Sequence, residues 1–194
     1  MKILEIAIVT CWLTLLVPSG LPQAQTAMSS PDGVKSVRKF AQDFYSWYVP
    51  KALDPRTDSV DLAMKHRGYA LSRELLKALK EDSEAQARAH EIVGLDFDPF
   101  LNTQDPAERY ELGRITQKGN TYLVDVFGVY PARPAELSEG IPEVIAEVAR
   151  RNGHWVFTNF LYPPIAKQYP ESGNLLAMLK SLKEAREASK AKHP

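Results

Sequence analysis

The sequence predicts an α+β domain in which a long N-terminal helix and further helices pack on a curved antiparallel sheet of about four strands. Three observations predict this class. Apolar residues recur at helical spacing from Val34 to Tyr48. Two turn signals, Gly119-Asn120 and Asn152-Gly153, each separate segments with strand-like patterns. A leucine-rich helical segment then follows, so helices and strands occupy separate parts of the chain.

The first residues have the composition of an export signal. Lys2 precedes an apolar run from Ile6 to Val17 of about a dozen residues, whereas a membrane-spanning helix needs ~20. We therefore expect residues 1–27 to be a signal peptide, the protein to be periplasmic, and the mature chain to lack a transmembrane segment. Cys11 is the only cysteine and has no small residue before it, so we expect neither a lipid anchor nor any disulfide.

The first helix carries the aromatic sequence "FYSWYVP". Phe44, Tyr45, Trp47 and Tyr48 fall in the same arc as the apolar residues before them, which favours a core anchor over a binding patch. Tyr45 is expected at the rim of this arc, with its hydroxyl able to reach water or a ligand. Pro50 predicts that the helix ends at Val49.

The segment after this helix, Lys51 to Gly68, reads as an irregular connection because of its proline, aspartates and threonine. Ser72 is a plausible N-cap for a helix to about Leu79. The capping-box spacing of Ser83 and Gln86 predicts a break and a new helix to about Ile92. The following "LDFDPFLNTQDP" is expected to be irregular.

Two hairpins are predicted next. The first pairs Tyr110–Gln117 with Thr121–Tyr130, which places Ile115 opposite Val124, Leu112 opposite Phe127 and Arg114 opposite Asp125. Arg114 and Asp125 then form either a solvated ion pair or a polar floor for a ligand.

The second hairpin pairs 144–151 with 154–162 around Asn152-Gly153. Its predicted core face consists of Val144, Ala146, Val148, Trp155, Phe157 and Leu161. Asn159 falls on the same face opposite Ala146, so its amide must meet backbone groups or line a polar spot in a cavity. A last helix carries Leu175 to Leu182. We expect one domain over 28–185 and a frayed polar tail over 186–194.

The sequence contains few residue patterns that indicate a chemical function. Formal net charge is zero, which argues against nucleic acid as a partner. No catalytic motif, metal-ligand spacing or phosphate loop occurs, so we expect no metal and no cofactor. Asp98, Asp105 and Asp125 remain candidate bases, although aspartates in such segments more often close turns.

Three stretches, "FYSWYV", "LDFDPFLNTQD" and "GHWVFTNFLYP", resemble the YbjP-like family of bacterial periplasmic domains of unknown function. The resemblance covers about Val34 to Leu182. It implies an NTF2-like or cystatin-like fold, with a long helix wrapped by a curved antiparallel sheet. No reaction is established for this family, so the resemblance implies no catalytic residues.

Three functions are left open. The first is a non-enzymatic envelope domain, monomeric or weakly dimeric, that acts through protein contacts, as an immunity or inhibitor protein would. The second is a carrier or sensor of a small ligand held between helix and sheet. The third is an NTF2-like enzyme with an aspartate base. The candidate binding residues are Tyr45, Trp47, Tyr48, Asp98, Gln104, Asp105, Arg114, Asp125, Asn159 and Tyr162.

Overall fold

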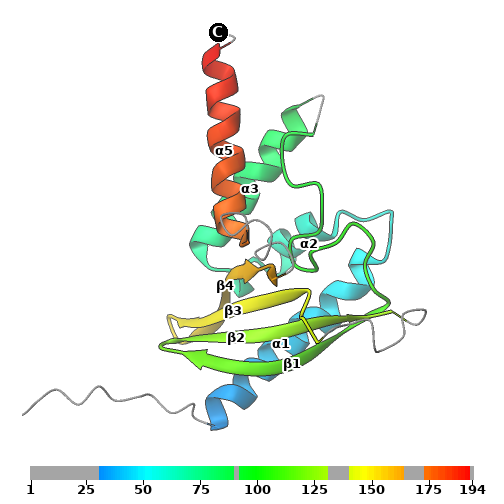
Figure 1. The fold of residues 1–194 in the computed structure, drawn as a ribbon, viewed down its shortest axis with the longest axis vertical. Coiled ribbons are helices and arrows are strands. Elements are labelled where there is room, and N and C mark those ends of the chain that lie inside the picture. The colour runs from blue at the N-terminus through cyan, green and yellow to red at the C-terminus, as the bar shows by residue number, and fades with distance from the viewer. Residues whose placement is uncertain (1–30, 90–91, 131–139, 164–172, 193–194) are drawn as a thin grey trace, which may run out of the picture.

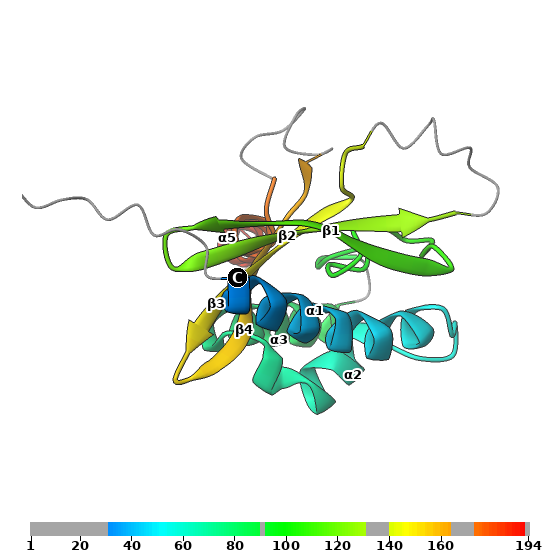
Figure 2. The same ribbon diagram turned by 90° about the horizontal axis from the view of Figure 1, so that it is seen from below.

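A computed structural model describes residues 31–89, 92–130, 140–163 and 173–192. The expected signal segment lies outside these residues. Among them, helix α1 crosses one face of a single antiparallel sheet whose strand order is β1-β2-β3-β4 (Figures 1 and 2). The predicted α+β class with four strands is therefore confirmed. No helix in the described ranges is both long and apolar enough to cross a membrane.

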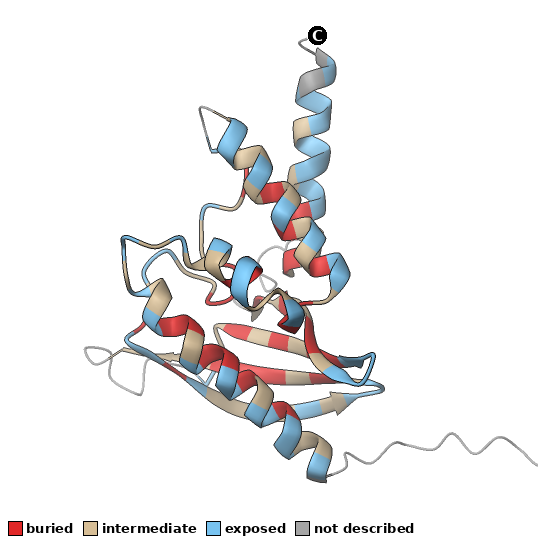
Figure 3. Ribbon diagram, turned by 180° about the vertical axis from the view of Figure 1, so that it is seen from behind, coloured by how far each residue is buried: buried red, intermediate tan, exposed pale blue. Residues whose placement is uncertain are grey.

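Helix α1 spans Pro31–Ala52 and turns its apolar arc toward the sheet, as predicted (Figure 3). The predicted end at Val49 is wrong, because the helix continues through Pro50. A proline inside a helix removes one N–H bond, here the bond to the carbonyl of Ser46. Pro50 and Ser46 are both exposed, so water can solvate that carbonyl while the buried side of the helix stays intact.

The segment predicted as an irregular connection contains helix α2, Ser59–His66. The Asp58 side chain caps α2 by accepting a hydrogen bond from the Asp61 amide, and the helix buries Ala63 and Met64. A helix of two turns has too few apolar positions to show a clear period, which explains why the prediction was wrong.

After the short 3₁₀ helix η1, Gly68–Ala70, helix α3 runs over Arg73–Arg88. Ser72 caps it through the Leu75 amide, as predicted. The predicted break at Ser83 is wrong, and α3 is continuous to Arg88. Helix α5, Leu175–Lys192, packs against α3 (Figure 1) and buries Asp82, which lies next to the expected break. Tertiary contacts therefore override the local capping pattern.

Strands β1, Arg109–Lys118, and β2, Thr121–Val129, form the first hairpin. Ile115 pairs with Val124 as predicted, but a bulge between Leu112 and Ile115 places Leu112 opposite Val126 instead of Phe127. The Arg38 guanidinium of α1 donates to the carbonyls of Leu112 and Gly113 at 3.0 and 2.7 Å.

Strands β3, Val144–Arg151, and β4, His154–Leu161, form the second hairpin. A bulge beyond Val148 pairs Asn159 with Glu147, not with Ala146. An extra residue reverses the facing of everything beyond it. Leu161 was therefore wrongly assigned to the core face, and Phe160 and Tyr162 are buried instead.

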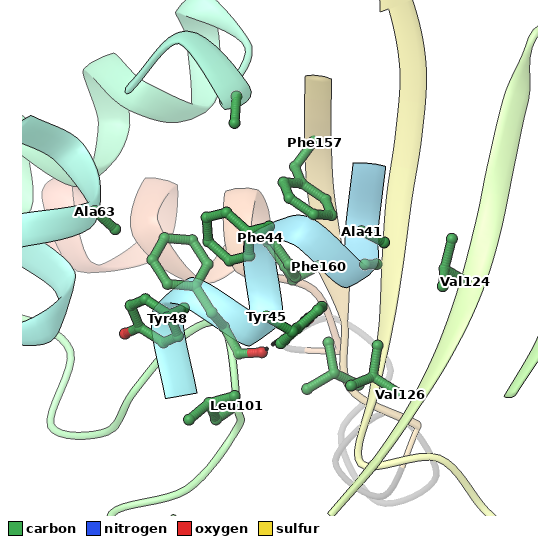
Figure 4. Close-up of a cluster of buried hydrophobic side chains, with 14 of the residues drawn as sticks. Ala41, Phe44, Tyr45, Tyr48, Ala63, Leu101, Val124, Val126, Phe157 and Phe160 are labelled. Carbon is green, nitrogen blue, oxygen red and sulfur yellow. Dashed lines mark hydrogen bonds between the residues drawn. The ribbon is translucent and has the colours of Figure 1, made fainter. Parts of the chain in front are cut away.

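The core centres on Phe44 (Figure 4). Its ring contacts those of Tyr45, Tyr48, Phe100 and Phe157 at centroid distances of 4.8 to 5.5 Å. Such ring pairs are worth about 0.5–1.5 kcal/mol each beyond the area they bury. The interpretation of the "FYSWYVP" stretch as a core anchor is thus confirmed.

Candidate functional site

The three candidate tyrosines are core residues. Tyr45, Tyr48 and Tyr162 are at most 1% exposed. The Tyr45 hydroxyl donates to the Phe100 carbonyl at 3.1 Å, and the Tyr162 hydroxyl donates to the Pro99 carbonyl at 2.8 Å. The expectation that Tyr45 lies at a solvated rim is wrong, because the segment around Phe100 covers it. Burial raises the pKa of all three hydroxyls well above the ordinary value.

Asp98 joins three parts of the fold. Its Oδ1 accepts hydrogen bonds from the amides of Phe100 and Leu101 at 2.9 and 3.2 Å. Its Oδ2 accepts one from the Tyr48 hydroxyl of α1 at 2.5 Å and one from the Ser59 hydroxyl of α2 at 3.4 Å. Loss of solvation raises the pKa of Asp98 to about 6, and these donors oppose the rise.

Asp98 borders an open groove of about 650 Å³ that Gln104 also lines. A general base needs a lone pair directed at its substrate. Both Asp98 oxygens are already occupied by two donors each, so the carboxylate closes a turn and fastens α1 and α2 to it. The arrangement therefore favours the structural role over the catalytic one.

The remaining aspartate candidates lie elsewhere. Asp105 is exposed, and its amide bonds the Thr103 hydroxyl. Asp125 and its neighbour Val124 point to opposite faces of the sheet. Asp125 is 9% exposed, and its Oδ2 lies 3.6 Å from Arg114 Nε. Burial raises the pKa of Asp125, and Arg114 opposes the rise. The predicted Arg114–Asp125 ion pair is present, and within the described residues no hydrogen bond or ion pair joins it to Asp98.

Asn159 meets both of its predicted alternatives, because it bonds backbone groups and also lines a groove that runs along β4. Its Oδ1 accepts from the amides of Phe160 and Leu176 at 2.9 and 3.1 Å, and its Nδ2 donates to Asn174 Oδ1 at 3.1 Å. Asn174 in turn caps helix α5, Leu175–Lys192, by accepting from Ala177. Asn159 therefore anchors the start of α5.

A groove of about 1050 Å³ runs along strand β4, the edge of the sheet. We name it the β4 groove. Its walls are the start of α3, the Phe40 side of α1 and the tip of the β3–β4 hairpin, and Tyr69, Arg73, Arg151 and Trp155 border it. Tyr69 is 68% exposed, unusually high for an aromatic residue.

Trp47, the remaining aromatic candidate, is not among the residues that line the β4 groove, but it connects to Tyr69 of the groove through Arg67. Trp47 is half-buried, and the Lys51 ammonium and the Arg67 guanidinium each lie over its indole, 4.3 and 4.9 Å from the ring centroid. Arg67 also donates to the Tyr69 hydroxyl. Sequence reasoning missed Tyr69 and Arg67, since they lie in a segment without periodicity and only their contacts mark them.

The described residues hold no group of three or more His, Cys, Asp or Glu side chains that could bind a metal ion.

Comparison with known proteins gives little further guidance. No family model matches the sequence, and no curated protein matches it. One solved structure is similar, a chain of the type VI native effector-immunity complex Tae3-Tai3 from Ralstonia pickettii. The TM-score is 0.45 and the sequence identity 18%, over 69% of this chain and 94% of that chain.

Proposed function

We propose that this chain is a non-enzymatic domain of a bacterial envelope that acts through contact with a partner protein, and that the partner binds at the β4 groove. An immunity or inhibitor protein is one form of this function. The observation that carries the proposal is the exposure of Tyr69 beside a groove that Trp155, Arg73 and Arg151 also border.

The composition of this surface supports a protein partner. Tyrosine, tryptophan and arginine are the residues most enriched where binding energy concentrates in protein interfaces. The groove also follows an edge strand. The Trp155 backbone groups point outward there, whereas the Phe157 carbonyl already accepts a hydrogen bond from the Ser72 amide. The two-residue turn at Asn152-Gly153 makes Arg151 and His154 the first hydrogen-bonded pair, so Arg150 and Trp155 form a non-hydrogen-bonded pair.

The two alternatives have less support. A carrier of a small ligand would use Tyr45, Tyr48 and Tyr162 to line a pocket, yet these side chains fill the core and bond protein groups. An enzyme with Asp98 as its base would need a free carboxylate oxygen, yet both Asp98 oxygens accept bonds from the protein. Neither observation affects the β4 groove, which remains open to a partner.

Site-specific photo-crosslinking in the native bacterium tests the proposal. p-Benzoylphenylalanine replaces Tyr69 in one strain and Thr116, an exposed residue of β1, in the control strain. We expect irradiation to give one discrete protein adduct from position 69 and none from position 116, with mass spectrometry identifying the partner. Adducts of equal yield from both positions, or none from position 69, would contradict binding at the β4 groove.

A further inference from the structure

Four side chains form a continuous row of alternating cations and aromatic rings on the surface. Lys51 and Arg67 lie on Trp47, and Arg67 continues to Tyr69, with its guanidinium carbon 5.9 Å from the tyrosine ring centroid. We name Lys51, Trp47, Arg67 and Tyr69 the cation–aromatic row. Residues from α1, the end of α2 and η1 build it, so the fold, rather than a local sequence pattern, assembles it.

The cations of this row have no counter-ion within the described chain. Among the described residues, Lys51 Nζ donates to the Trp47 carbonyl alone, at 3.0 Å, and the Arg67 guanidinium to the Tyr69 hydroxyl alone. Both side chains are half-buried, where an unpaired charge is more costly than on an open surface. Other basic residues differ: Lys39, Lys77, Arg88 and Lys180, for example, each pair with a carboxylate one helical turn away.

The row is continuous with the β4 groove. Tyr69 belongs to both, and Phe40 of the groove lies two helical turns before Trp47 on the same side of α1. Arg73 and Arg151 border the groove, and in the described part of the chain no carboxylate lies within ion-pair distance of either. Glu74 and Glu147 also line the groove and balance these two arginines, so the net positive charge of the combined surface comes from Lys51 and Arg67 of the row.

We infer that the cation–aromatic row binds carboxylates of the partner, so that the β4 groove and the row together select an acidic segment of a protein. This inference rests on the proposed function for the location of the partner and adds its chemistry. A carboxylate at the row would meet the Lys51 ammonium and the Arg67 guanidinium, both of which lie over the Trp47 ring. The preorganised guanidinium would cost little entropy on binding.

Peptide display on the full-length protein tests the inference with a defined probe. Random peptides displayed on phage are selected against the wild-type protein, and the enriched peptides are then synthesised and titrated against variants. The variant Lys51→Gln with Arg67→Gln removes both charges of the row. The matched control, Lys80→Gln with Arg109→Gln, removes one lysine and one arginine charge at exposed positions of α3 and β1.

We expect enriched peptides to be rich in Asp and Glu, to lose roughly tenfold or more in affinity for the row variant, and to bind the control like wild type. Their affinity should also fall with added salt. Enriched peptides that are neutral, or acidic peptides that bind the row variant and the wild type equally, would overturn the inference. A short DNA duplex that binds as tightly as the peptides would also overturn it, since the row would then attract any polyanion.

The outcomes separate this inference from the proposed function. A Tyr69→Ala variant is titrated in parallel. Neutral peptides that bind wild type but not the Tyr69→Ala variant would leave the groove as a protein-binding site and remove only the acidic preference. Failure to enrich any peptide would overturn the acidic preference, while the crosslinking at position 69 would still decide on the partner.

Discussion

The Tyr48 hydroxyl lies 2.5 Å from Asp98 Oδ2, a contact that joins α1 to the segment preceding the sheet. Ser59 of α2 bonds both groups, at 3.1 Å to Tyr48 and 3.4 Å to Asp98. Two helices and one turn therefore depend on a single partly buried carboxylate. Its protonation should be visible in the stability of the whole domain.

Replacement of Asp98 by Asn should flatten the dependence of stability on pH. The folded pKa of about 6 lies above the ordinary value of 3.8, so folding favours the protonated carboxyl. Its contribution to stability is fully present below about pH 4 and is lost as pH rises through about 6, a loss of about 3 kcal/mol. We expect urea unfolding of the wild type to show this decline and Asp98→Asn to lack it.

The control for this experiment is Asp96→Asn, an exposed aspartate two positions earlier. It should reproduce the wild-type slope between about pH 4 and pH 7. An Asp98→Asn protein with the same slope as wild type would mean that this carboxyl is not the group whose ionisation opposes folding.

Replacement of Arg186 by Met should destabilise the domain by about 3 kcal/mol, because it leaves the Asp82 carboxylate buried without its counter-ion. Arg186 Nη1 lies 2.6 Å from Asp82 Oδ1 and also donates to the Val93 carbonyl, while Asp82 Oδ2 accepts from Leu95. Urea unfolding at neutral pH measures the change. The pair should matter because its side chains are only 15% and 8% exposed.

Lys183→Met is the matched control, since Lys183 lies one turn before Arg186 on α5 and pairs with Glu81 at the surface. Exposed pairs contribute little, so unfolding should change hardly at all. A double variant, Asp82→Asn with Arg186→Met, should recover much of the lost stability. Equal effects of Arg186→Met and Lys183→Met would contradict the role of burial.

Replacement of Asn159 by Ala should loosen the start of α5. The Leu176 amide would lose its acceptor, and Asn174 would lose the donor that orients it. We expect a cost of about 1–2 kcal/mol and faster hydrogen exchange at Leu176 and Ala177. Thr158→Ala alters the same strand but removes a hydroxyl that bonds Glu147 of β3, so it should leave these two amides at wild-type rates. A similar acceleration in both variants would argue against the anchor.

Local patterns predict much of this fold. The apolar arc of α1, the Ser72 cap and the two hairpin turns each depend on neighbours within a few residues, so their sequence signals suffice. The errors have non-local causes. Nothing near Tyr45 in the sequence indicates that Phe100 covers its hydroxyl, 55 positions away.

The candidate site was less predictable than the fold. The sequence drew attention to carboxylates and aromatics, but most of these residues stabilise the core, as the buried Tyr162 does. The bulge in β4 moves the last residues of this strand to the opposite face of the sheet from the one predicted. A periodic sequence pattern does not indicate where such a bulge occurs. Arg67 and Tyr69 become recognisable only through their contacts with Trp47 and with each other.

The contact of Arg38 with the Leu112 and Gly113 carbonyls also limits how copies of this protein can associate. Open-ended fibrils grow when each sheet offers two free edges to its neighbours. Here the guanidinium and the bulge interrupt the β1 edge midway. At the opposite edge, Leu71 forms a bridge with Phe157 of β4, and the Ser72 amide donates to the Phe157 carbonyl at 2.8 Å. A domain whose two sheet edges are both interrupted should resist polymerisation at high concentration.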